Sequence, residues 1–254
     1  MNTSDSTKHL LISILLILFF VPAATLSAQH FEGEITYEFT DVTDGSTDTL
    51  NMLVAENRLV LRGNVRQYVD FPLFRDTITI RTDRNDLLIH TETAVAAVNL
   101  GELSTILRQF MNNSGNAQQP QTADTDRLAE RTYLTETTET RRIHGMRARK
   151  FILHDREIEN RETHLWLADA DINWGALLQP VNDLLSTFGG GTSLSSVPWE
   201  LSMTPLLAED YVGGELRAKV EATQFQSRRL SADEKDIPEG KQQISLFQLM
   251  MMQN

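Results

Sequence analysis

Residues 31–39 read Phe-Glu-Gly-Glu-Ile-Thr-Tyr-Glu-Phe, and this stretch sets a pattern that much of the chain repeats. From Gly33 onward, a glycine or an apolar side chain occupies every second position, and Glu or Thr stands between. Successive side chains of a strand point to opposite faces, so this alternation predicts a β-strand with one buried face.

Short segments with a similar character follow along the chain, separated by turn residues such as Asp44-Gly45 and His144-Gly145. Strands with a turn roughly every eight to twelve residues are typical of antiparallel barrels and sandwiches. The predicted strands are residues 49–54, 59–62, 77–81, 87–91, 94–100, 132–140, 147–153, 163–167, 199–207 and 215–230.

Two segments have the helical period instead. Apolar residues recur three and four positions apart in residues 102–111 and again in residues 174–188, which predicts two amphipathic helices. Pro180 predicts a kink in the second helix. Residues 112–126 and 189–196 are polar or glycine-rich, and we expect mobile loops there. The predicted fold class is therefore mainly β with two helices (α+β).

The N-terminus has the features of an export signal. Lys8 precedes an apolar run from Leu10 to Val21, and small residues lead up to Ala28. This order predicts a signal peptide over residues 1–28 and a single mature domain over residues 29–254. The alternative is a retained anchor, but the run is shorter than the roughly 20 residues that span a bilayer. We therefore expect a periplasmic protein of the bacterial envelope.

Composition excludes several classes of function. The 254 residues contain no cysteine, which rules out disulfides, thiol nucleophiles, iron–sulfur clusters and a lipid-modified N-terminal cysteine. The 35 acidic and 23 basic residues give a net charge of -12, which argues against nucleic acid as a partner. No other segment is apolar enough to cross a membrane, so we do not expect an integral membrane protein.

No catalytic motif is present, and we expect no enzyme activity, no metal and no cofactor. His154 and His164 can face each other across a hairpin, where the alternatives are a metal site and a solvated cross-strand pair. Asp171 can bind calcium or act in acid–base catalysis, but we favour a role in capping the following helix. The basic residues in 141–150 form either an anion-binding face or a solvated one.

Four short motifs resemble a known family. They are Phe31-x-Gly33-x-Ile35-x-Tyr37, Ile143-x-Gly145-x-x-Ala148-x-Lys150-Phe151, Trp166, and Ile237-Pro238-x-Gly240. Together they resemble an exported bacterial family of unknown function that is similar to the LolA/LppX lipoprotein-carrier fold. The resemblance implies a strongly curved antiparallel half-barrel with helices capping its concave face. Lys241 departs from the pattern, because an aromatic residue is expected there, and residues 112–126 form a long insertion.

The sequence thus predicts a non-enzymatic protein that binds an acyl chain, a lipoprotein or another amphiphile under a helical lid. A packed core without a cavity is the competing interpretation of the same apolar stripes. A second hypothesis is an envelope interaction module that binds a protein partner through a sheet edge or the basic strand, without a lipid cavity. The candidate lining residues are Leu107, Phe110, Trp166, Trp174, Leu177 and Leu178.

Overall fold

The computed structural model of the chain describes residues 31–63, 77–103, 105, 132–156, 158, 160–178 and 203–251. Strands account for 63% of these residues, and all of them belong to one 12-stranded sheet. The predicted signal segment, residues 1–28, and the predicted loops, 112–126 and 189–196, lie outside the described residues.

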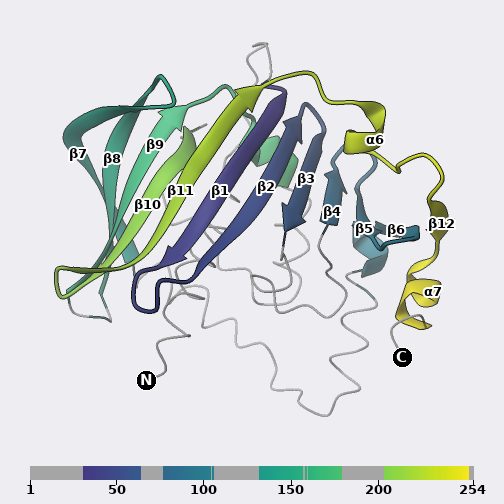
Figure 1. Ribbon diagram of the computed structural model, residues 1–254, viewed down its shortest axis with the longest axis horizontal. Helices are drawn as coiled ribbons and strands as arrows, with labels where there is room; N and C mark the ends of the chain where they lie inside the picture. Colours follow the sequence, from purple (N-terminus) through teal and green to yellow (C-terminus); the bar gives the residue numbers. More distant parts are fainter. Residues whose placement is uncertain are drawn as a thin grey trace.

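The first half of the chain forms an antiparallel meander of six strands (Figure 1). Tight turns at Asp44-Gly45 and Glu56-Asn57 join its first strands, as the turn residues predict. The strands are β1 (Gly33–Asp41), β2 (Thr47–Ala55), β3 (Arg58–Gly63), β4 (Thr77–Arg81), β5 (Asp86–His90) and β6 (Ala94–Asn99).

The second half forms another antiparallel meander, which runs outward from the middle of the sheet in the opposite order. Two of its hairpins turn at His144-Gly145 and Gly213-Gly214, and all four of these residues have positive φ. The strands are β7 (Thr132–Ile143), β8 (Met146–Asp155), β9 (Arg161–Asp169), β10 (Met203–Val212) and β11 (Glu215–Ser227).

The two meanders join where β1 pairs with β11. The pairing is antiparallel and runs from Gly33 opposite Ser227 to Asp41 opposite Ala218, with a β-bulge at Thr36/Tyr37. The sheet order is therefore β12-β6-β5-β4-β3-β2-β1-β11-β10-β9-β8-β7, with β6 and β7 far from the centre. The two ends of the sheet do not pair, so the sheet is open.

The predicted fold class, an α+β antiparallel half-barrel capped by two helices, is wrong. The sheet is mixed, because β12 (Gln242–Ile244) adds to β6 in parallel. The helices among the described residues are short, and the structure is mostly β. Residues 100–103 and 105 are helical, as are residues 174–178, and the rest of both predicted helices lies outside the described residues. The sequence pattern identified most strands correctly, but it did not show that they continue into one open sheet.

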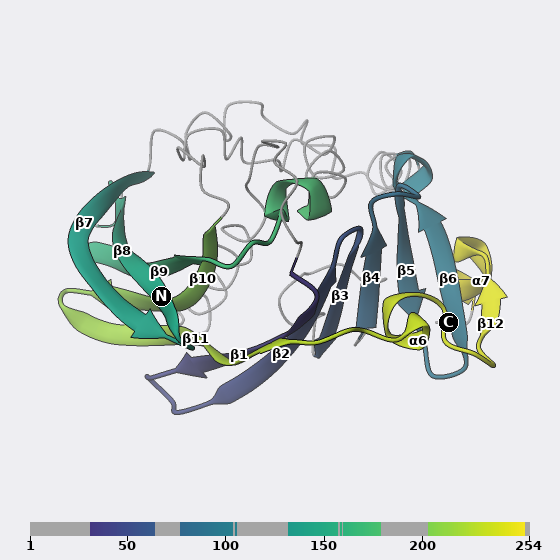
Figure 2. The same ribbon diagram turned by 90° about the horizontal axis from the view of Figure 1, so that it is seen from above.

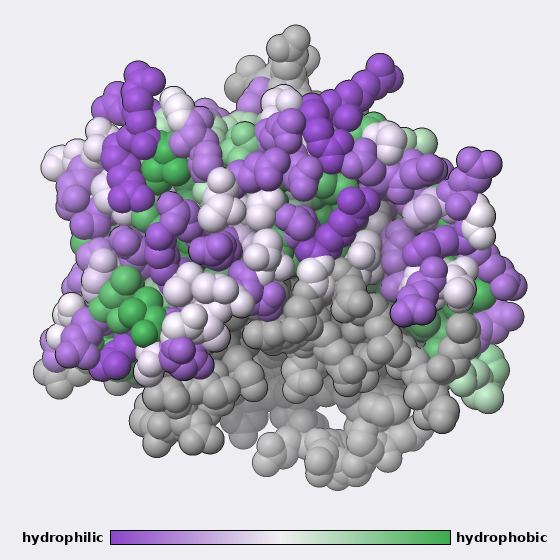
Figure 3. All heavy atoms as spheres, viewed as in Figure 1, coloured by the Kyte–Doolittle hydropathy of each residue, from purple (hydrophilic) through white to green (hydrophobic). Residues whose placement is uncertain are grey.

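The sheet has an apolar inner face and a largely hydrophilic outer face. Seen from above, it curves around the helix at residues 174–178, which lies on the inner side (Figure 2). The outer face, which Figure 3 shows, is dominated by polar side chains. The buried inner-face residues are Ile35, Tyr37, Phe39, Leu50, Met52, Val54, Leu59, Leu61, Ile78, Ile80, Leu87, Ile89, Ala94, Ala96, Val98, Phe151, Leu165, Leu167, Ala208, Ala218, Val220 and Ala222.

After β11 the chain runs along the outer side of the first meander, in a segment that we name the C-terminal strap (residues 228–244) (Figure 2). Leu230 forms a small buried cluster with Leu53, Ala55 and Val60. The helix α6 (Ala232–Lys235) begins with a capping box, in which the Ser231 and Glu234 side chains each bond the other residue's backbone N–H. The short helix α7 (Leu246–Met251) ends the described chain.

Ion pairs fix the strap to the sheet. The guanidinium of Arg81, which is 3% exposed, contacts Asp86 of its own hairpin and Asp236 of the strap, both at 2.5 Å. Arg228 contacts Glu34 of β1 and Glu234 of α6. Hydrogen bonds from Arg228 and from the Ser231 backbone lower the pKa of Glu234 to about 2. The strap is thus held at the centre of the sheet and at β4.

Tyr37 ties the centre of the sheet to the second meander. It is 2% exposed, and its hydroxyl donates a hydrogen bond of 2.9 Å to the backbone carbonyl of Pro205 on β10. Because the site is buried, this carbonyl depends on a protein donor rather than on bulk water.

We predict that Tyr37→Phe lowers the free energy of unfolding by about 1–2 kcal/mol, because the Pro205 carbonyl loses its partner while the ring stays packed. Urea denaturation measures the change. Tyr133→Phe is the matched control, because Tyr133 is 46% exposed, and it should change stability by less than about 0.5 kcal/mol. Equal effects from the two substitutions would contradict this interpretation.

His90 is a buried group that titrates in an acidic range. Burial, together with the positive charges of Lys241 and Arg62, lowers its pKa to about 4. One ring nitrogen, Nε2, lies 2.9 Å from the Thr79 hydroxyl. The folded protein therefore favours neutral His90, whereas the unfolded chain protonates it near its ordinary value of 6.5.

As the pH falls, the unfolded state takes up this proton before the folded state does. The contribution of His90 to stability should therefore be constant above pH 6.5 and should fall as the pH drops from 6.5 to about 4. His90 should account for up to about 3 kcal/mol of that loss. Urea denaturation at several pH values measures it. His90→Asn retains a polar partner for Thr79 and should flatten the slope in this window, whereas an unchanged slope would rule out His90 as its source.

Candidate functional site

The helix at residues 174–178 is anchored to the inner face of the sheet. The side chain of Asn173 accepts a hydrogen bond from the Ala176 N–H at 3.1 Å, which caps the helix. The indole N–H of Trp174 donates to the Thr204 hydroxyl at 3.0 Å, and both residues are almost fully buried. One turn of helix is thus fixed beside the start of β10 by a buried polar contact.

The predicted lining residues lie in different places. Trp174, Leu177 and Leu178 are at most 2% exposed and belong to the apolar cluster of the inner face. Leu107 and Phe110 lie outside the described residues. Trp166 lies on the other side of β9 from Leu165 and Leu167, because side chains alternate along a strand. The three helix residues and Trp166 belong to one core cluster, although the Trp166 side chain leaves β9 on the side opposite to Leu165 and Leu167.

Trp166 is in contact with two basic side chains on the outer face of the sheet. The guanidinium of Arg141 lies 4.5 Å from the ring centroid, and the ammonium of Lys150 lies 5.9 Å from it. Trp166 is 8% exposed, and its indole nitrogen has no hydrogen-bond partner among the residues that the structure describes. The basic side chains and the tip of the β7–β8 hairpin thus pack over this tryptophan.

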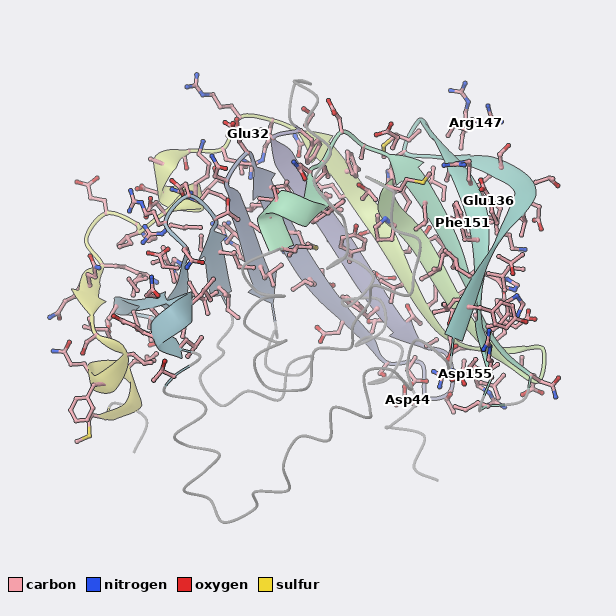
Figure 4. All side chains as sticks on the ribbon, turned by 180° about the vertical axis from the view of Figure 1, so that it is seen from behind. Glu32, Asp44, Glu136, Arg147, Phe151 and Asp155 are labelled. Atoms are coloured by element: carbon pink, nitrogen blue, oxygen red, sulfur yellow. The ribbon has the colours of Figure 1, made fainter. Side chains whose placement is uncertain are left out.

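Charged side chains stand at one end of the apolar inner face. Arg149 lies 5.5 Å from the ring of Phe151, contacts the sulfur of Met203 at 3.2 Å and pairs with Glu136. Glu136, Arg147 and Phe151 lie near this end of the second meander (Figure 4). A guanidinium that is stacked on an aromatic ring beside an apolar surface can bind an anionic group at that edge.

A buried ion pair lies toward the other end of the same strands. Asp210 is 0% exposed and accepts hydrogen bonds from Arg161 at 3.2 and 3.1 Å and from the Thr163 hydroxyl at 3.3 Å. Burial raises the pKa of Asp210, while Arg161 and Thr163 oppose that change. Both oxygens of this carboxylate have partners, so the pair is best explained as part of the scaffold.

The two histidines that the sequence placed across a hairpin do lie close together. Both approach one carboxylate, since His154 Nδ1 is 3.3 Å and His164 Nε2 is 3.4 Å from oxygens of Glu162. Within the described ranges, no group of three or more His, Asp or Glu residues is arranged to hold a metal ion. His154 lies opposite Glu162, and His164 lies opposite Ile152, so the two histidines are on neighbouring strands but not directly opposite each other.

Asp171 does not cap the following helix. It has a φ of 56°, and the capping side chain is that of Asn173. The preference of helix N-termini for acidic side chains located the start of this helix correctly, but the residue that caps it is Asn173 and not Asp171. Separately, no helix in the described part of the chain is long and apolar enough to cross a membrane.

The comparisons with known proteins place the chain in no family. No family model matches it, and no curated protein matches it. Two solved structures of PNGF-II, in space groups C2 and P21, are similar with TM-scores of 0.38 and 0.37 and sequence identities of 14% and 16%. Each similarity covers 86% of this chain and 32% of the PNGF-II chain.

The structure of MucB is similar with a TM-score of 0.37 and 13% identity, over 91% of this chain and 63% of the MucB chain. This chain thus matches only part of each of these proteins. Likenesses at this level carry no argument about function, and the resemblance to the LolA/LppX fold stays a prediction.

Proposed function

We propose that the protein binds the acyl chain of a lipid, a lipoprotein or another amphiphile against the inner face of its sheet, and that it does so without catalysis. The observation that carries the proposal is the apolar inner face, which continues from Ala94 on β6 to Phe151 on β8. The predicted export signal in residues 1–28 supports a place in the bacterial envelope, where such ligands occur.

The size and chemistry of the inner face suit an acyl chain. A strand rises about 3.3 Å per residue, so the nine residues of β1 extend over about 30 Å. Each methylene group that leaves water contributes about 0.8 kcal/mol, and burying eight of them contributes about 6 kcal/mol. Micromolar binding corresponds to about 8 kcal/mol, and association itself costs about 4 kcal/mol or more. About sixteen methylene groups, which contribute roughly 13 kcal/mol, must therefore leave water along the inner face.

Several positions of the inner face have small side chains. Ala96 on β6, Ala208 on β10 and Ala222 on β11 are all inner-face residues. A polar end is also present, since Arg149 stands beside Phe151 at the edge of the apolar surface. An acyl chain with a polar head matches this combination better than a wholly apolar ligand does.

We predict that the purified protein, after delipidation, takes up a fluorescent fatty acid with micromolar affinity. Ala96→Leu and Ala208→Leu should each weaken this uptake about tenfold or more, because the added groups fill space on the inner face. Fluorescence titration measures the affinity, and native mass spectrometry before delipidation shows whether the protein carries a bound amphiphile.

Ala97→Leu is the matched control, because Ala97 is next to Ala96 on β6 but belongs to the outer face, opposite Leu88. It should leave the uptake unchanged. Circular dichroism verifies that each variant is folded. Absence of uptake by the parent protein, or equal uptake by the inner-face and outer-face variants, would refute the proposal.

A further inference from the structure

Two arginines face each other at the tip of the β7–β8 hairpin. Arg142 on β7 is directly opposite Arg147 on β8, and both side chains are exposed. Like charges in this position destabilise a β-hairpin. The arrangement therefore costs stability in the isolated protein.

The neighbouring basic side chains have partners among the described residues. Arg149 pairs with Glu136, and Lys150 lies 3.0 Å from a carboxylate oxygen of Glu139. Arg141 lies over the ring of Trp166. Within the described part of the chain, Arg142 and Arg147 form no ion pair, although the protein as a whole has a net charge of -12.

The backbone next to this pair is also free to bind. Strand β7 is the last strand of the sheet, so its outer edge has no neighbouring strand among the described residues. Both turn residues, His144 and Gly145, have positive φ, which is typical of a two-residue type I′ turn. In such a hairpin Ile143 and Met146 exchange hydrogen bonds, so the N–H and C=O of Arg142 point away from β8.

A bulge confines the free edge to a short segment. The register of β7 against β8 shifts between Glu136 and Thr140, which bends the strand there. Bulges and charged side chains are the usual protection of sheet edges against unwanted pairing. Residues 140–143, between the bulge and the turn, keep regular pairing with β8 and form a regular edge.

Contacts with the rest of the protein fix the tip of the β7–β8 hairpin in the absence of a partner. The His144 ring contacts the backbone carbonyl of Ala222 on β11 through Nε2, at the point where the β1–β11 register shifts. The stacking of Arg141 on Trp166 fixes the same end of β7 to the outer face. A partner would therefore lose little entropy in ordering this edge.

We propose that the edge of residues 140–143, together with Arg142 and Arg147, binds an extended acidic segment of a partner protein. The segment would add a strand to β7 through main-chain hydrogen bonds, and its carboxylates would accept from the two guanidinium groups. The rest of the acidic surface would repel such a segment, so binding is directed to this hairpin. The main-chain hydrogen bonds of this interaction form at the edge of the sheet, so they do not require an amphiphile on the inner face.

A pair of synthetic peptides tests the proposal on the full protein. The first peptide, Val-Glu-Val-Glu-Val-Glu-Val with a fluorescent label, can form a strand that places its carboxylates on one side. The second has the same sequence and charge but carries N-methyl groups on alternate residues, which removes the main-chain donors. We expect the first to bind and the second to bind at least tenfold more weakly. Failure of the first to bind, or equal binding of both, would overturn the proposal.

Charge reversal tests the arginines separately from the backbone. The double variant R142E/R147E should lose at least tenfold in affinity for the first peptide. R84E/R229E is the matched control, because it makes the same change of charge at exposed arginines on other elements, and it should lose much less. Similar losses in both variants would show a nonspecific effect of net charge and would overturn the proposal.

The single variant R142E tests the cost of the like-charge pair. The new carboxylate would face Arg147 with opposite charge, so the midpoint of thermal unfolding should rise while the affinity for the first peptide falls. An unfolding midpoint that falls, or an affinity that is unchanged, would contradict the inference. Fatty-acid uptake should persist in all these variants, so the outcome of the peptide experiment can be told apart from that of the amphiphile experiment.

Discussion

Strand β1 lies between two strands from opposite ends of the chain, β2 on one side and β11 on the other, and the rest of the sheet depends on that position. The close approach at its first residue shows how tightly the junction is built. A Cβ atom at Gly33 would lie 2.1 Å from the Gln226 carbonyl oxygen and 2.7 Å from the Phe31 ring. Only glycine lets the two halves of the chain meet there.

This junction determines the other features of the molecule. Because the meanders meet at their β1 and β11 ends, β6 and β7 are left toward the outside of the sheet. On one side the chain covers the edge with its own tail, since β12 pairs with β6 after the C-terminal strap has run along the outer side. On the other side β7 is left as the last strand, and its protection comes from a bulge and from charged side chains.

Local patterns predicted the strands well but not their arrangement. The period-two alternation identified β1 to β6 with small errors at their ends, and turn residues such as Asp44-Gly45 marked the hairpins. The pairing of β1 with β11 joins segments that are far apart in sequence, and one strand's alternation does not identify its neighbour. The fold class was wrong for this reason, and because the resemblance suggested a capped half-barrel.

Two further features of the structure could also be predicted from the sequence. The capping box at Ser231 and Glu234 marks the start of α6 and is visible in the sequence, but it is not part of the period-two pattern that predicted the strands. The Arg142–Arg147 register follows from counting outward from the two-residue turn at His144-Gly145. The contact of Tyr37 with Pro205 and the ion pair of Arg81 with Asp236 depend on tertiary structure, so no local pattern contains them.

Strand β8 connects the two surfaces that the proposals concern. Phe151 belongs to the apolar inner face, Arg149 lies beside its ring, and Arg147 stands two residues further toward the tip of the hairpin. Alternation places these three side chains on one face of β8, in an order that runs from buried and apolar to exposed and charged. A polar head at Arg149 and a carboxylate at Arg147 would therefore be neighbours, about two residues or roughly 7 Å apart along the strand. At that distance two anionic groups repel each other unless the guanidinium groups neutralise them, so the balance of charge at Glu136 and Arg149 decides whether both surfaces can be occupied at once.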